Sequence, residues 1–385
     1  MEYNRVLSLL SRLSDMPLDF PLYQNDNLFF PQFVEKLLDD YVDIFKNEFF
    51  SEIDDISKAK RMLTRIEGLK QTIVDVLKYY YNGNLLRATQ VFHVGISEIF
   101  STKIPNSTQK LSINKRLYRA RVCNYKAYLS REDIFHIGFE NRHLVSTSRF
   151  SIPGLPALYL SDSTYTCWEE FRRYKIKKLW FSKFKNIRQL NVIKLERKSD
   201  FIRSIHPNYR YDNKIVENAE DLIYDYLVVF PISLICSIKV KVDDASFKPE
   251  YIIPQLLLQF VSSKRGIDGI KFPSTKVDYT RLRNIESYNY IFPVKKSLNA
   301  GFCSVLKDSF ELTIPTNLER EEVASHTFAG ETHSKIFGDH RSITLFDEHS
   351  TGYGETAFGK IEYILSRKRL AKIGSIEKRL SEFDL

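Results

Sequence analysis

The chain has 385 residues, of which 43% are apolar and 14% aromatic, so it can bury a sizeable core in two or three domains. A charged fraction of 27% excludes a chain that is disordered by composition, and the net charge of +9 suits an anionic partner such as a nucleotide, a nucleic acid or a membrane surface. Four cysteines lie far apart without a CxxC spacing, which argues against a zinc ribbon, a thioredoxin motif or a disulfide-stapled secreted domain.

The N-terminal segment is interrupted by charge before an apolar run becomes long enough for a signal peptide, and no stretch approaches the ~20 apolar residues of a membrane span. We therefore expect a cytoplasmic protein without a membrane partner. No His, Cys, Asp or Glu cluster has metal-ligand spacing, so we expect no metal.

Residues 1–112 are predicted to form an all-α domain. Apolar periodicity predicts helices over residues 31–49, 51–80 and 85–100. Ser51 with Asp54 predicts a capping box at the start of the second helix. Residues 101–112 are polar and predict a linker.

Within this domain Arg87 and His93 form an R-x5-H pair like that of HEPN ribonucleases. Two residues six apart on a helix lie about 240° apart and do not share a face. A HEPN-like shape without nuclease activity is the better interpretation.

From residue 117 the pattern changes to short strands, which indicates an α+β domain over residues 113–295. We predict strands at 117–122, 157–161, 191–195, 236–240, 269–274 and 288–293, and helices near 163–174, 214–229 and 249–263. Residues 296–385 are predicted to be a C-terminal extension with a strand at 310–314 and a basic helix near 361–373.

The densest basic tract is Lys175–Lys185, in which lysines alternate with apolar residues. This pattern favours an amphipathic strand with a solvated lysine face over a nucleic-acid contact.

The segment FHIGFENRHLVSTSRFSIPGLPALYLSDSTYTCWEEF (135–171) contains R-F-S-x-P-G-x-P-x-L-Y-L followed by S-x-x-x-C-W-x-E. Together with YRAR (118–121) and GIKFPS (269–274), it resembles the RES-domain family. The resemblance covers roughly residues 115–295. It implies an ADP-ribosyltransferase-like mixed sheet and a toxin that consumes NAD by phosphorolysis or hydrolysis, or transfers ADP-ribose.

The resemblance assigns catalytic roles to Arg119, Glu170 and Ser274, and nucleotide-binding roles to Arg149 and Tyr159. The neighbouring Glu169 is an alternative to Glu170 as the active carboxylate. Tyr118, as a second candidate for ring stacking, and Ser151, in the arginine loop, complete the expected site.

Residue chemistry supports this assignment. Cleavage of the nicotinamide–ribose bond passes through an oxocarbenium-like sugar, which a carboxylate such as Glu170 stabilises. Guanidinium groups, here Arg119 and Arg149, bind a diphosphate with paired hydrogen bonds. A tyrosine face packs on a base or on nicotinamide, and the Ser274 hydroxyl can hold phosphate or ribose.

Each residue also has a purely structural interpretation. Glu169 and Glu170 suit the first turns of a helix, and Arg119 suits a strand surface that Arg121 shares. Tyr159 lies between leucines and could simply pack, and His136 is better read as a core or turn histidine than as part of the pocket. The combination in family order favours the nucleotide site.

We therefore expect an NAD phosphorylase or glycohydrolase, with NAD as substrate and inorganic phosphate as the candidate co-substrate. The alternatives are a protein or nucleic-acid ADP-ribosyltransferase, and a non-catalytic nucleotide-sensing or RNA-binding module. Growth arrest or phage defence, an antitoxin or immunity protein as partner, and a homo-oligomer are further expectations from the resemblance.

Overall fold

The computed structural model describes residues 2–24, 28–100, 104–124, 128–205, 217–241, 245–324, 340–345 and 349–374. The chain divides into two compact units, each assembled from segments that are separate in the sequence. The first comprises residues 1–109, 147–152 and 191–275, and the second comprises residues 110–146, 153–190 and 276–385. The fold class is α+β, as predicted.

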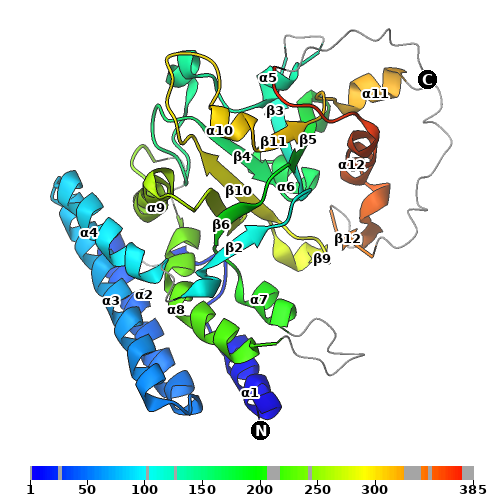
Figure 1. Ribbon diagram of the computed structural model, residues 1–385. Helices are drawn as coiled ribbons and strands as arrows, with labels where there is room; N and C mark the ends of the chain where they lie inside the picture. Colours follow the sequence, from blue (N-terminus) through cyan, green and yellow to red (C-terminus); the bar gives the residue numbers. More distant parts are fainter. Residues whose placement is uncertain are drawn as a thin grey trace. The chain divides into compact units, whose positions relative to one another are not determined.

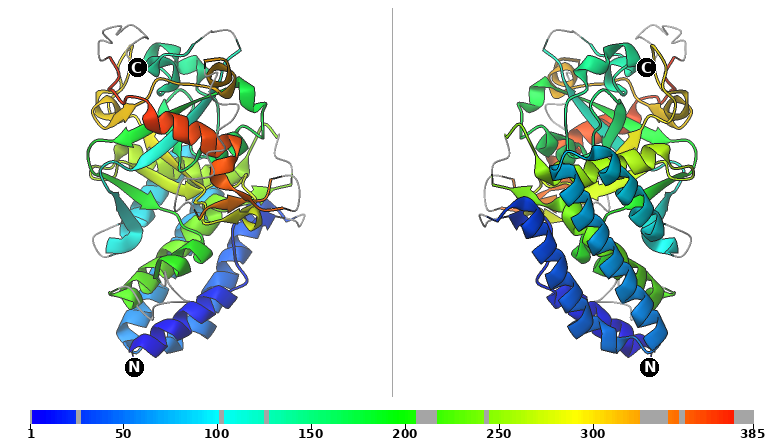
Figure 2. Two further views of the ribbon diagram at one scale, coloured as in Figure 1. Left: turned by 90° about the vertical axis from the view of Figure 1, so that its right-hand side faces the viewer. Right: turned by 90° about the vertical axis from the view of Figure 1, so that its left-hand side faces the viewer.

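The first unit is mainly helical (Figure 1). Its helices are α1 (Glu2–Asp15), α2 (Phe30–Ile44), α3 (Ile56–Tyr81), α4 (Leu85–Ile99), α7 (Lys198–Ile205), α8 (Ala219–Ser237) and α9 (Ile252–Ser263). Its strands form two parallel pairs, β1 (Tyr23–Gln24) with β7 (Lys239–Val240), and β6 (Leu190–Lys194) with β8 (Gly269–Pro273). Figure 2 shows α3 and α4 running side by side as a long pair.

Helices α2, α3 and α4 occur where periodicity predicts them, but α1 lies outside the predicted ranges and two local predictions are wrong. Asp55, not Ser51, caps α3, and its carboxylate accepts hydrogen bonds from the amides of Ser57 (2.8 Å) and Lys58 (3.0 Å). The predicted linker contains a 3₁₀ turn and the strand β2 (Thr108–Leu111). This strand carries one buried apolar residue, Leu111, so it has no alternating pattern to reveal it.

The second unit contains an antiparallel sheet in the order β11-β5-β3-β4-β10. These strands are β3 (Arg116–Val122), β4 (Ala157–Ser161), β5 (Leu179–Asn186), β10 (Tyr288–Pro293) and β11 (Phe310–Leu312). A small sheet joins β9 (Leu282–Arg283), β12 (Ser342–Ile343) and β13 (Thr351–Gly352). The helices are α5 (Arg131–Ile134), α6 (Thr164–Glu170), α10 (Ser304–Lys307), α11 (Leu318–Ala324) and α12 (Ala357–Arg367).

The strand β5 corrects the interpretation of the basic tract. Seven of its eight residues are buried, including Lys183, whose ammonium donates a hydrogen bond to the carbonyl of Ser366 (3.2 Å). Side chains on both faces of the strand are covered, and α12 packs against it, so it has no solvated lysine face. Packing on both faces overrides the alternation that the sequence shows.

The core of the second unit includes the C-terminal segment. Phe358, Ile361 and Leu365 of α12 belong to the same buried cluster as Tyr165 and Trp168 of α6. The Phe358 ring centroid lies 5.4 Å from that of Tyr165 and 5.2 Å from that of Trp168. Residues that follow the predicted α+β domain in sequence therefore complete its core.

We predict that Phe358→Ala lowers the free energy of unfolding by about 3–5 kcal/mol, because it removes a buried ring and leaves a cavity. Urea denaturation followed by circular dichroism measures the change. Lys360→Ala, at an exposed position of the same helix, is the matched control and should change stability by less than about 0.5 kcal/mol. Equal effects of both substitutions would contradict a core role for α12.

Candidate functional site

The centre of the second unit is the junction of β3 and β4. β3 pairs with β5 from Arg116↔Lys185 to Val122↔Leu179, but it is in register with β4 only at Tyr118↔Ser161. Next to this single pair, the Arg119 guanidinium reaches toward β4 and donates from Nη1 to the carbonyl of Tyr159 (2.9 Å). The structure thus brings Arg119 and Tyr159 together, as the sequence analysis expects.

Arg119 is a half-buried cation without a paired carboxylate in the described residues. Its Nε is enclosed and has no hydrogen-bond partner, and within the described part of the chain no carboxylate pairs with it. Burial, and next the like charge of Arg121, lower the pKa of Arg119 to about 9, so the group stays charged at neutral pH. A buried charge without a counterion is costly, and an anionic ligand would compensate it.

Glu170 lies at the last position of α6 and is exposed. Its Oε1 accepts a hydrogen bond from Nδ2 of Asn289 on β10 (2.6 Å), and Oδ1 of Asn289 accepts one from the Ser161 hydroxyl on β4 (2.6 Å). This chain of hydrogen bonds orients the carboxylate from β10 and from β4, the strand that pairs with β3. A fixed, solvent-accessible carboxylate is suited to contact a ligand.

Glu169 has the opposite environment. It is 3% exposed, its two carboxylate oxygens accept from Nε and Nη2 of Arg173 (both 3.0 Å), and Oε1 also accepts from the Tyr165 hydroxyl (2.5 Å). Both partners lie four residues from Glu169, in α6 and just after it. The structure therefore separates the two carboxylates that the sequence leaves as alternatives, and it favours Glu170 as the functional one.

Helix α6 is fixed at its start by a residue from the C-terminal segment. Glu362 of α12 is 8% exposed, and its Oε1 accepts from the Thr164 amide (3.0 Å) and the Tyr353 hydroxyl (2.7 Å). Ser163 caps the helix by accepting from the Thr166 amide (3.1 Å). Burial raises the pKa of Glu362 above its ordinary value, while these donors oppose that shift.

The two tyrosines expected to stack on a ligand differ in burial. Tyr118 is buried in the cluster with Tyr165 and Phe358, and burial raises the pKa of its hydroxyl. Tyr159 is half-buried beside Arg119. Tyr159 is thus better placed to meet a ligand, and Tyr118 supports the sheet beneath α6.

The remaining expected residues, Arg149, Ser151 and Ser274, belong to the first unit. The Arg149 guanidinium donates from Nη1 to the carbonyl of Cys236 (3.2 Å) and lies 5.3 Å from the ring centroid of Tyr251. These contacts hold the side chain at the ends of α8 and α9.

Ser151 and Ser274 lie in two segments that pack against each other, the arginine loop and the end of β8. The Ser151 hydroxyl accepts from the Ser148 amide (2.7 Å) and donates to the Ser148 carbonyl (3.0 Å), which closes the arginine loop. Phe150 packs on Phe272 of β8 (ring centroids 4.2 Å apart), and buried Ser274 follows the end of that strand. The nucleotide-binding role of Ser151 stays a prediction, because both of these bonds serve the loop.

His136 is a core histidine, in agreement with the preferred of its two interpretations. It is 1% exposed, its Nε2 accepts from the Cys303 amide (2.9 Å), and Nδ1 lies 2.8 Å from the carbonyl of Ile137. These partners place the proton on Nδ1. Burial lowers the pKa of His136 to about 4, so the ring is neutral at neutral pH.

Sequence reasoning missed Asn289, Ser161 and Glu362. Asn289 was read only as part of an apolar strand, although an amide in the buried segment YNYIFP is itself a signal, because buried polar groups need partners. Glu362 lies beyond the segment that resembles the RES-domain family, so no motif pointed to it.

Comparison with known proteins identified a relative from Bacillus subtilis (strain 168), named "Putative toxin YopC". The two chains are 29% identical over 354 residues, which cover 86% of this chain and 76% of the relative. No family model and no solved structure matches the chain. Within the described residues, no helix is long and apolar enough to cross a membrane.

We predict that Glu169→Ala and Glu170→Ala separate stability from function. Glu169→Ala removes a buried acceptor from Tyr165 and Arg173, and should cost about 2–3 kcal/mol of unfolding free energy because Arg173 is partly exposed. Glu170→Ala should cost less than about 1 kcal/mol. Urea denaturation of both proteins tests this, and the reverse order would assign the structural role to Glu170.

We predict a pH dependence that originates in His136. Because its pKa falls from 6.5 to about 4 on folding, the unfolded chain binds more protons between these values. The stabilisation is complete above pH 6.5 and is lost as the pH falls toward 4, in total about 3 kcal/mol. Unfolding free energies of the native protein and His136→Gln, measured from pH 7 to pH 4, should converge as the pH falls. Parallel curves would contradict a neutral buried ring.

Proposed function

We propose that the chain is an NAD-degrading enzyme that cleaves the nicotinamide–ribose bond by phosphorolysis or hydrolysis. The observation that supports this most is the half-buried Arg119 guanidinium, whose Nε is enclosed; it has no counterion in the described residues and lies in the same unit as exposed Glu170. A diphosphate supplies the missing anion, and the ribose beside it needs a carboxylate.

In this proposal the bond between ribose C1′ and the nicotinamide nitrogen breaks, and nicotinamide leaves with the electron pair. Phosphate or water then forms the new bond to C1′, and an attacking water loses its proton to solvent. Glu170, oriented by Asn289, stabilises the positive charge that develops on the sugar. Arg119 holds the diphosphate and Tyr159 packs against a ring of the nucleotide.

Arg149 and Ser274 join the proposal through the RES-domain resemblance, as a second phosphate-binding arginine and a phosphate- or ribose-binding serine. Support from the structure is that loop 147–152 and the end of β8 are packed together through Phe150 and Phe272. Their contribution is tested by the same assay as that of Arg119.

A toxin role follows from the relative named as a putative toxin, and it is compatible with NAD depletion as the cause of growth arrest. On this proposal an antitoxin or immunity protein would protect the producing cell. Expression of the chain in a bacterial host should arrest growth, and Glu170→Gln should relieve the arrest.

ADP-ribosyl transfer to a protein or nucleic acid is the second candidate. The exposure of Glu170 favours it, because a carboxylate at the surface leaves room for a macromolecular nucleophile. Labelled NAD incubated with cell lysate distinguishes the two activities, since transfer leaves a labelled macromolecule and hydrolysis does not.

We predict that the purified protein releases nicotinamide from NAD, and that Glu170→Gln and Arg119→Lys each reduce the rate by ~100-fold or more. Charge-matched controls are Glu355→Gln and Arg116→Lys, at exposed positions of the same unit, and they should retain activity. Release measured with and without phosphate separates phosphorolysis from hydrolysis. Absence of release by folded protein, with or without lysate, would leave only a nucleotide-binding module.

A further inference from the structure

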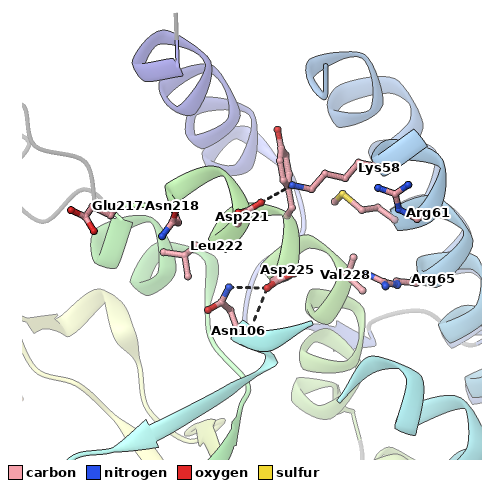
Figure 3. A pocket seen from close by; sticks show the side chains of 12 residues that line it. Lys58, Arg61, Arg65, Asn106, Glu217, Asn218, Asp221, Leu222, Asp225 and Val228 are labelled. Atoms are coloured by element: carbon pink, nitrogen blue, oxygen red, sulfur yellow. Dashed lines mark hydrogen bonds and ion pairs between the residues drawn. The ribbon is translucent and has the colours of Figure 1, made fainter. Parts of the chain in front are cut away.

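The first unit contains a cavity of about 690 Å³ between α3 and α8 (Figure 3). Its volume falls in the range of small-molecule sites, about 300–1,000 Å³. The lining is unusually rich in charge for a site of this size, with three cations and three carboxylates. The lining residues are Lys58, Arg61, Met62, Arg65, Asn106, Glu217, Asn218, Asp221, Leu222, Tyr224, Asp225 and Val228.

The three cations come from one face of α3. Lys58, Arg61 and Arg65 are spaced three and four residues apart, which places them on successive turns of the same side. Lys58 is already engaged, because its ammonium lies 2.6 Å from an oxygen of Asp221. The two arginines are therefore the cations available to a ligand.

Neither arginine has a strong partner. Arg61 approaches Asp55 only at 3.6 Å, and both side chains are more than half exposed. Arg65 makes no ion pair or hydrogen bond within the described residues. Figure 3 shows the two guanidinium groups on the α3 side of the cavity. Two neighbouring guanidinium groups suit a dianionic phosphate better than a single carboxylate.

The opposite wall offers an acceptor. Oδ2 of Asp225 on α8 accepts from the amide (3.2 Å) and from Nδ2 (2.8 Å) of Asn106. Its Oδ1 has no hydrogen-bond donor in the described part of the chain. Burial raises the pKa of Asp225, while the two hydrogen bonds from Asn106 oppose that shift. A ligand hydroxyl would satisfy the remaining oxygen.

We propose that this cavity binds a small phosphorylated sugar, with its phosphate on Arg61 and Arg65 and a sugar hydroxyl donating to Asp225. The described residues leave Arg65 and one oxygen of Asp225 without a protein partner on two walls of one cavity, and a sugar phosphate carries an anion at one end and donors at the other. The cavity belongs to the first unit, whereas Arg119 and Glu170 belong to the second, so the proposal does not depend on NAD cleavage.

The test is isothermal titration calorimetry of the full chain with ribose 5-phosphate, inorganic phosphate and ribose at millimolar concentrations. Ribose 5-phosphate should bind, inorganic phosphate should bind more weakly, and ribose should not bind. Arg65→Gln should weaken ribose 5-phosphate at least ~10-fold, because it removes one of two phosphate-binding forks. Asp225→Asn should weaken ribose 5-phosphate and leave inorganic phosphate unchanged.

Lys60→Gln is the matched control, since Lys60 is exposed on α3 and does not line the cavity. Circular dichroism verifies that each variant is folded. No binding of ribose 5-phosphate to the folded native protein would overturn the proposal, as would binding that Arg65→Gln leaves unchanged. Equal affinities for ribose 5-phosphate and phosphate, both insensitive to Asp225→Asn, would reduce the cavity to a simple anion site and refute the sugar contact.

Discussion

The Arg119 guanidinium, half-buried and without a counterion in the described part of the chain, is the constraint on which the second unit depends. A charge that is partly removed from water needs neighbouring dipoles to stabilise it, and an anionic ligand would stabilise it further. The carbonyl of Tyr159 supplies the dipole where β3 and β4 share a single register pair. The guanidinium thus donates one hydrogen bond from β3 to β4, and its Nε–H has no acceptor in the described residues.

Helix α6 shows how adjacent residues of one type take different roles. Glu169 points into a closed network with Tyr165 and Arg173, and Glu170, one residue on, ends the helix at the surface. Because successive helical residues are rotated by about 100°, one neighbour is buried and the other is not. Glu362 from α12 holds the other end of the helix, so the C-terminal segment helps to set the direction in which Glu170 points.

Charge is handled differently in the first unit. There Arg61 and Arg65 of α3 line one cavity with Asp225 but form no ion pair with it in the described residues, while Lys58 and Asp221 beside them do pair. Ion pairs at a surface contribute little to stability, so their absence is no defect of the fold. Leaving donors and acceptors separated by a cavity is the arrangement expected of a recognition site.

The sequence by itself determined the α+β class, helices α2 to α4 and most strands, because periodicity is a local property. The association of Arg119 with Tyr159 was expected from the family resemblance, not from a local pattern. Tertiary structure alone decided that β5 is buried on both faces, that Glu169 is structural, and that α12 completes the core. Asn289 and Glu362 also became visible only in three dimensions. The contacts of Asn289 and Glu362 join residues more than one hundred positions apart, and no local pattern encodes such contacts. Glu169 bonds to residues only four positions away, but the burial of that side of α6 depends on the tertiary structure.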